Sequence, residues 1–184
     1  MRMNSGVRTD DVLRLLDDAS LPESIRGPLT SGNELTRISL DSEGQWRHEG
    51  ELFVNTNLMA LFHRSIRRTA GGTYFLQIPP FSYPIVVSDT PRYVRHIRWS
   101  ESTQRTEIKL FLSDGSEELL DPYRLSYVPE RGLYCQVLAP DEGYWSARFL
   151  RPAYYSISEH IIEQDDEYFL DLPSGRVSIP VVAV

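Results

Sequence analysis

The chain has 184 residues, 41% of them hydrophobic and 24% charged, which is ordinary usage for a globular protein long enough to bury a core. The net charge of −7 argues against nucleic acid as a partner, because an acidic surface repels phosphate backbones. One cysteine excludes an intramolecular disulfide, Met1 to Thr9 lacks an apolar signal-peptide core, and no apolar run approaches the ~20 residues of a membrane helix. We therefore expect a soluble cytoplasmic protein with no membrane segment.

The first half of the chain alternates helix and strand signals. Thr9 is a suitable cap for a helix with two aspartates in its first turn, ending near Ser20. Proline, glycine and serine are frequent over residues 22–33, which predicts a connector. The other elements expected in this half are, in order, a strand at 35–40, its partner at 45–48, a helix from Asn55 or Asn57 to about Thr69, and strands at 73–78 and 83–87.

The second half contains the clearest local signal. Residues 106–112 alternate between apolar and charged side chains, and Asp114-Gly115 then provides a tight turn before a strand at 116–120, which predicts a hairpin. We expect these strands to form a meander with one buried face. The other elements expected here are strands at 93–99, 125–128, 133–138 and 144–149, a helix at 152–164, and strands at 168–172 and 176–184.

Two segments of the chain match each other. The run Tyr74-Phe75-Leu76-Gln77-Ile78-Pro79 is similar to Tyr168-Phe169-Leu170-Asp171-Leu172-Pro173, and each follows a predicted helix and precedes a branched apolar run. This order predicts a strand-rich α+β fold of two similar lobes, each an antiparallel sheet with one packed helix, plus an N-terminal helix. The alternative is a helix-hairpin order that recurs without common descent. The expected parts are an N-terminal helix and connector (1–34), a first α+β repeat (35–92), a central β-meander (93–130) and a second α+β repeat (131–184).

No motif in the sequence names a chemistry. The chain lacks a GxSxG elbow, a P-loop and a GxGxxG run, so it carries no predicted catalytic residue. The histidines do not have metal-ligand spacing, and we predict neither a metal nor a cofactor; they are His48, His63, His96 and His160. Cys135 lies in an apolar strand-like run, which favours a buried structural thiol over a nucleophile. The basic group Arg64, Arg67 and Arg68 is interpreted as the solvated end of a helix in preference to a phosphate site.

Aromatic and polar residues suggest where a ligand would bind. The run from Trp46 to Gly50 is the most concentrated polar-aromatic cluster, and a rigid proline-rich loop ends near Tyr83. The predicted ligand-binding residues are Trp46, His48, Glu49, Tyr74 and Tyr83. His48 and Glu49 also allow an acid-base pair if a turn brings them together, although a purely structural pairing or capping role is the simpler interpretation.

Ordered motifs in the chain resemble a bacterial family of unknown function, DUF1285. The motifs are Ile38-Ser39-Leu40-Asp41, Gly44-Gln45-Trp46-Arg47-His48-Glu49-Gly50, then Leu58, Leu61, Phe62, Gly72, Tyr74, Leu76 and Pro79, and the turn Asp89-Thr90-Pro91. The resemblance implies an α+β fold of two related structural repeats and a role in ligand binding or signal transduction, with no catalytic residue to transfer. The chain departs from the pattern at Ser42-Glu43, at Arg47, where the family often has an aromatic, and by an extension before Leu35.

Three functions follow as hypotheses. The preferred one is a non-enzymatic module that binds a small molecule or peptide in a cleft between the lobes and acts in regulation or signal transduction. The second is an enzyme that uses His48 and Glu49 in that cleft, and the third is a protein-interaction subunit, for which a homodimer is one assembly to test. The sequence identifies neither the ligand nor the partner.

Overall fold

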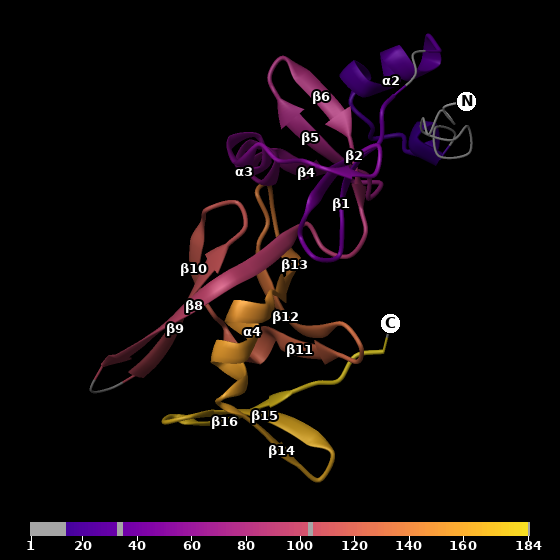
Figure 1. Ribbon diagram of the computed structural model, residues 1–184. Helices are drawn as coiled ribbons and strands as arrows, with labels where there is room; N and C mark the ends of the chain where they lie inside the picture. The colour runs from indigo at the N-terminus through magenta and orange to yellow at the C-terminus, as the bar shows by residue number, and fades with distance from the viewer. Residues whose placement is uncertain (1–13, 33–34, 103–104, 184) are drawn as a thin grey trace. The chain divides into compact units, whose positions relative to one another are not determined.

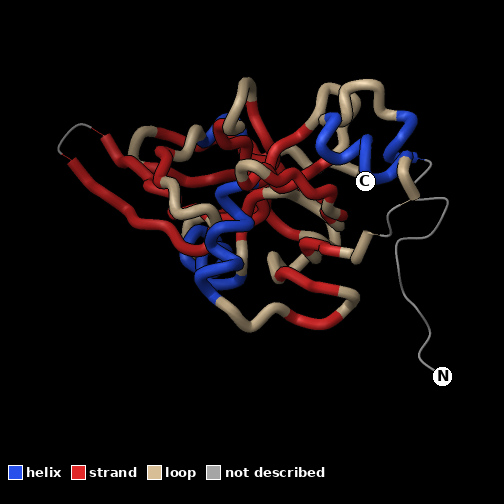
Figure 2. The backbone as a smooth tube through the Cα atoms, turned by 90° about the horizontal axis from the view of Figure 1, so that it is seen from above, coloured by secondary structure: helices blue, strands red, loops and turns tan. Residues whose placement is uncertain are grey.

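More of the backbone is strand than helix in the computed structural model, which describes residues 14–32, 35–102 and 105–183 (Figure 2). The predicted α+β class is therefore confirmed. Contacts divide the chain into a first unit, Met1–Asp89, and a second unit, Thr90–Val184. None of the described helices is long and apolar enough to cross a membrane.

Among its described residues, the first unit contains two small sheets, the helices α2 and α3, and a helical turn at residues 14–17 (Figure 1). One sheet has the strand order β3-β2-β1-β7, in which β1 and β7 run parallel, and the other is the antiparallel sheet β4-β5-β6. The elements in chain order are α2 (Glu23–Thr30), β1 (Ile38–Leu40), β2 (Trp46–His48), β3 (Glu51–Leu52), α3 (Thr56–Ser65), β4 (Ile66–Arg68), β5 (Tyr74–Ile78), β6 (Phe81–Pro84) and β7 (Val86–Val87).

Helix α2 occupies the segment predicted to be a connector. Ile25 and Leu29 are four residues apart, so they share one face of a helix, and both are buried with Leu21 against Phe75 of β5. The prediction was wrong because the Pro and Gly content outweighed this short apolar spacing. Pro28 is accommodated inside the helix.

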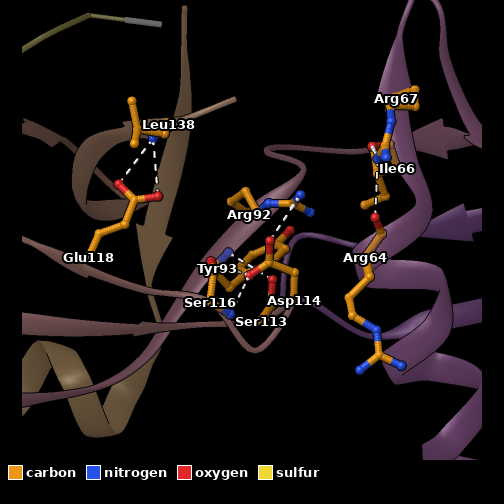
Figure 3. A network of polar contacts seen from close by, with 10 residues as sticks. All are labelled: Arg64, Ile66, Arg67, Arg92, Tyr93, Ser113, Asp114, Ser116, Glu118 and Leu138. Carbon is orange, nitrogen blue, oxygen red and sulfur yellow. Dashed lines mark hydrogen bonds and ion pairs between the residues drawn. The ribbon is translucent and has the colours of Figure 1, made fainter. Parts of the chain in front are cut away.

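Helix α3 begins where the sequence indicates and ends earlier. The Asn55 side chain accepts a hydrogen bond from the Leu58 N–H at 3.1 Å, as an N-cap should. The helix was predicted to continue to Thr69, but Ile66 pairs with Leu76 and starts strand β4. The Arg67 side chain donates to the Ile66 carbonyl at 2.8 Å and to the Arg64 carbonyl at 3.1 Å, which supports this change of direction (Figure 3).

The second unit is built on a six-stranded sheet of order β10-β9-β8-β13-β12-β11 and a three-stranded sheet β14-β15-β16. Among its described strands the pairs are antiparallel except for β8 with β13, which are parallel, and Tyr127 forms an isolated parallel bridge with Val181. The predicted lobes had antiparallel sheets only, so the two parallel pairs, β1–β7 and β8–β13, correct that detail. The elements in chain order are β8 (Arg92–Ser102), β9 (Arg105–Leu112), β10 (Glu117–Leu119), the 3-10 helix η1 (Pro122–Arg124), β11 (Leu125–Val128), β12 (Gly132–Leu138), β13 (Tyr144–Phe149), α4 (Arg151–Ser158), β14 (Ile161–Gln164), β15 (Glu167–Leu172) and β16 (Gly175–Ile179).

The predicted hairpin at Asp114-Gly115 is present as β9 and β10, and an ion pair and hydrogen bonds connect its turn to β8 (Figure 3). The guanidinium of Arg92, which is 3% exposed, pairs with the Asp114 carboxylate at 3.1 Å. Asp114 also accepts from the Ser116 N–H at 3.0 Å, and the Ser113 hydroxyl accepts from the Tyr93 N–H at 3.3 Å. A buried arginine is tolerated here because its charge is paired.

The two matching runs occupy the same place in their sheets. Leu76 of β5 and Leu170 of β15 are both buried in the middle strand of a three-stranded antiparallel sheet that directly follows a helix. Helix α4 ends at Ser158, not at residue 164 as predicted, because Ile161 pairs with Leu170 and forms strand β14. The order of helix and three strands thus occurs in both units, and common descent of the two segments stays a prediction.

Candidate functional site

A cavity of about 300 Å³ lies within the first unit. Most of its lining is apolar, with hydroxyl groups and two arginines among the exceptions. The lining residues are Arg14, Leu15, Leu35, Thr36, Arg37, Ile38, Gly72, Thr73, Tyr74, Pro84, Ile85 and Val86. They come from the helical turn at residues 14–17, the entry to β1, the turn between β4 and β5, and the link between β6 and β7.

Asp18 connects two of these segments. Its carboxylate accepts hydrogen bonds from the Ser20 N–H at 2.9 Å, the Ser20 hydroxyl at 2.5 Å and the Thr69 hydroxyl. The Thr69 hydroxyl oxygen in turn accepts from the Thr73 N–H at 2.9 Å, and Thr73 lines the cavity. The hydrogen bonds from Ser20, and then those from Thr69, hold the pKa of Asp18 well below its usual range. One buried carboxylate therefore ties the Arg14 segment to the turn before β5.

Two of the predicted binding residues hold the entry to β1 in place. The Tyr83 hydroxyl donates to the Thr36 carbonyl at 2.8 Å. The Glu49 carboxylate accepts from the Arg37 N–H, and the Glu49 N–H donates to the Arg37 carbonyl at 2.8 Å. Glu49 adopts a φ of 50° in the turn between β2 and β3, and Gly50 follows with a φ of 87°. Both angles lie in the left-handed region, which glycine adopts more easily than other residues. Glu49 and Tyr83 thus position Thr36 and Arg37, which line the cavity.

Tyr74 is the predicted binding residue that lines the cavity itself. The Arg68 guanidinium carbon lies 5.3 Å from the centroid of its ring, and Arg68 Nε donates to the Gly72 carbonyl at 3.4 Å. Burial raises the pKa of Tyr74, and the nearby Arg68 charge opposes that rise. Tyr74 therefore stays a neutral phenol, and Arg68 contributes a third positive charge beside the cavity.

The remaining two predicted residues lie away from the cavity lining. Trp46 is fully buried and packs edge-on against Phe62 at 5.1 Å and His63 at 5.4 Å between ring centroids, so it is a core residue. His63 itself is buried. In the predicted basic group, Arg64 and Arg68 are exposed, and Arg67 and Arg68 lie on β4, past the end of α3. His48 is exposed on β2, with its ring centroid 5.9 Å from that of Phe53.

The other side chains that could carry chemistry are the metal-ligating types and the thiol of Cys135. Within the part of the chain that the structure describes, no three histidine, cysteine or acidic side chains are grouped as metal ligands. Cys135 is fully buried on β12, and burial, followed by the charge of Glu118, raises the pKa of its thiol far above the usual range. Such a thiol is protonated at neutral pH and serves the core, as predicted.

Sequence reasoning missed the three arginines around the cavity. Arg14 and Arg37 stand alone in regions of mixed composition, and Arg68 was grouped with a helix end. No ion pair joins any of the three to an acidic residue in the described ranges. Their convergence depends on strand pairing between β4 and β5 and on the Asp18 network, so no local pattern could have indicated it.

The comparisons with known proteins concern the fold. No protein-family model matches the chain, and no curated protein matches it. A DUF1285 family protein from Silicibacter pomeroyi is similar with a TM-score of 0.59 and 17% sequence identity, over 77% of this chain and 78% of that one. A DUF1285 family protein from Shewanella baltica is similar with a TM-score of 0.50 and 17% identity, over 68% of this chain and 92% of that one.

These structures define the class. The chain has a DUF1285-like fold, and the predicted resemblance is confirmed at that level. Identity of 17% shows the fold alone and transfers no ligand or activity. Function has to be argued from the cavity.

Proposed function

We propose that the first unit is a non-enzymatic binding module for a small organic anion, namely a carboxylate or phosphate attached to a short apolar body. The main support for this proposal is the apolar cavity of about 300 Å³ that is lined by Arg14 and Arg37 and flanked by Arg68. Ligand sites are characteristically apolar pockets with a few convergent polar groups. Arginine is suited to the anionic end, because its planar fork matches a carboxylate or phosphate.

The surroundings favour binding over catalysis. Burial raises the pKa of Tyr74, so its phenol is neutral. The Glu49 carboxylate accepts a hydrogen bond from the Arg37 N–H, so the role of Glu49 is to hold the backbone at Arg37. His48 is exposed and is not among the residues that line the cavity. An enzyme using His48 and Glu49 as an acid-base pair is therefore the weaker hypothesis. A role in signal transduction would be the consequence of ligand binding.

Calorimetric titration of the full chain with hexanoate, hexyl phosphate and hexan-1-ol tests the proposal. We expect hexanoate to bind with a dissociation constant of roughly 0.1–1 mM, in keeping with the efficiency of ligands this small. Hexan-1-ol has the same tail without the charge and should bind about tenfold more weakly. The ratio between hexanoate and hexyl phosphate then identifies the preferred headgroup.

Charge-removal variants locate the site. Arg37→Gln and Arg14→Gln should each weaken hexanoate binding by about three- to tenfold, since the arginines are exposed and partly screened. Arg64→Gln is the matched control: it removes an exposed arginine of the same unit that does not line the cavity. Equal binding of hexanoate and hexan-1-ol, or equal losses in all three variants, would refute an anion site at this cavity.

A further inference from the structure

The second unit contains a separate cavity, of about 270 Å³, that is rich in tyrosine. Tyr127 of β11, Tyr154 of α4 and Tyr168 of β15 line it. The rings of Tyr127 and Tyr168 have centroids 5.2 Å apart and planes inclined by 50°, so they form a tilted pair and not a parallel stack. None of the three phenol groups forms a hydrogen bond with another described residue, so an incoming ligand does not have to break one.

Strand pairing fixes the positions of these rings. The Tyr127 N–H donates to the Pro180 carbonyl at 2.9 Å, and the Val182 N–H donates to the Tyr127 carbonyl at 2.8 Å. Tyr168 lies between two neighbours, paired with Glu163 of β14 on one side and with Ile179 of β16 on the other. The rings are therefore carried by hydrogen-bonded strands, as a preorganised site requires.

The charge of this cavity is opposite to that of the first one. Glu163 is the charged side chain among its described lining residues, and it lies directly across the strand pair from Tyr168. The proximity of that carboxylate, with burial as a second cause, raises the pKa of Tyr168. The rest of the lining includes the apolar side chains of Leu133, Ile161 and Ile179.

We propose that this cavity binds a small organic cation with a methylated ammonium group. The faces of aromatic rings carry partial negative charge and attract cations, and tyrosine-walled sites suit quaternary ammonium groups because their methyl surface needs no hydrogen bonds. An unmethylated ammonium would lose hydration against the apolar side chains without recovering it. Glu163 adds attraction for a cation and repels an anion.

The two cavities each contain a tyrosine at the same strand position. Tyr168 occupies the position in β15 that Tyr74 occupies in β5, and each tyrosine lines the cavity of its own unit. The first cavity is lined by arginines and the second by Glu163, so the same strand position has opposite electrostatic surroundings. The ligand proposed here is independent of the anion proposed above, and either can fail without the other.

The test is a calorimetric titration of the full chain with choline and with its uncharged isostere 3,3-dimethylbutan-1-ol, in which carbon replaces nitrogen. We expect choline to bind in the millimolar range and at least about fivefold more tightly than the isostere. Ethanolamine, the unmethylated analogue, should bind more weakly than choline. Equal binding of choline and the isostere, or no heat from choline at concentrations up to about 20 mM, would overturn the proposal.

Variants of Tyr168 and Glu163 distinguish loss of the binding site from loss of the folded structure. Tyr168→Leu should weaken choline binding at least fivefold, by the lost ring attraction, whereas Tyr168→Phe retains the ring and should bind within about twofold of the wild type. Glu163→Gln should weaken binding about two- to fivefold at low salt, since Glu163 is exposed. Tyr123→Leu removes a tyrosine that is 82% exposed and outside the cavity, and should leave binding unchanged. If Tyr168→Leu folds and binds choline as the wild type does, the site is not at this cavity.

Discussion

Replacing Asp18 by asparagine should destabilise the protein, because a single carboxylate holds together the segments that build the first cavity. The substitution retains the size of the side chain and removes its charge. The carboxylate, in a residue that is 9% exposed, accepts from two Ser20 groups and from the Thr69 hydroxyl. Hydrogen bonds to a charged group contribute about 1.5–3 kcal/mol each, but they are not additive, and Ser20 is exposed and regains bonds to water. We expect Asp18→Asn to lower the free energy of unfolding by about 2 kcal/mol and the melting temperature by about 4–8 °C.

The stability difference between the wild type and Asp18→Asn should decrease as the pH falls. The pKa of Asp18 is lower in the folded protein than in the unfolded chain, so its contribution to stability is present above the unfolded value of about 3.9. It is lost as the pH falls from there toward the folded pKa. The stability difference between wild type and Asp18→Asn should therefore be constant from about pH 7 to pH 5 and smaller by about 1 kcal/mol near pH 3.

Urea unfolding curves of both proteins across this pH range measure the effect. Asp17→Asn is the matched control, since Asp17 is the exposed neighbour and should change stability by less than about 0.5 kcal/mol. Equal stability of Asp18→Asn and the wild type at neutral pH would refute the reasoning. So would a difference that is still undiminished near pH 3.

Further predictions follow from the same structure. Gly71→Ala should cost about 1–3 kcal/mol in urea unfolding, because the added Cβ would lie 2.2 Å from an Asp18 carboxylate oxygen; an unchanged midpoint would contradict this. Cys135 should react with a maleimide only after denaturant is added, since its thiol is fully buried; rapid labelling of the native protein would show otherwise. Val86→Trp should obstruct the first cavity and weaken hexanoate binding at least tenfold, whereas Leu52→Trp, at a similarly exposed position outside it, should leave binding unchanged; equal effects would exclude a site there.

Local signals account for the parts of the fold that the sequence predicts correctly. The Asp114-Gly115 turn and the alternation before it specify a hairpin within a short segment, and Asn55 caps the start of α3 through a neighbour three residues away. The end of α3 is different. Ile66 leaves the helix because Leu76 offers a strand partner, and that partner is invisible to a window along the chain.

The candidate site shows the same limit. Tyr74, Glu49 and Tyr83 were all predicted to bind a ligand. Tyr74 lines the cavity, whereas Glu49 and Tyr83 do not line it and instead hold Arg37 and Thr36 in place. Trp46 was chosen for its aromatic ring, but that ring is fully buried in the core and packs against Phe62. Apolar burial and ligand binding use the same aromatic residues, so composition alone does not separate the two roles.

The most direct test of the central claim maps hexanoate onto the assigned amide resonances of the protein by heteronuclear NMR. If the first cavity binds a small organic anion, saturable shifts should be concentrated on lining residues such as Thr36, Gly72, Thr73 and Ile85, and hexan-1-ol should cause much smaller ones at the same concentration. Hexanoate shifts that are absent, unsaturable or centred on other residues would contradict the claim.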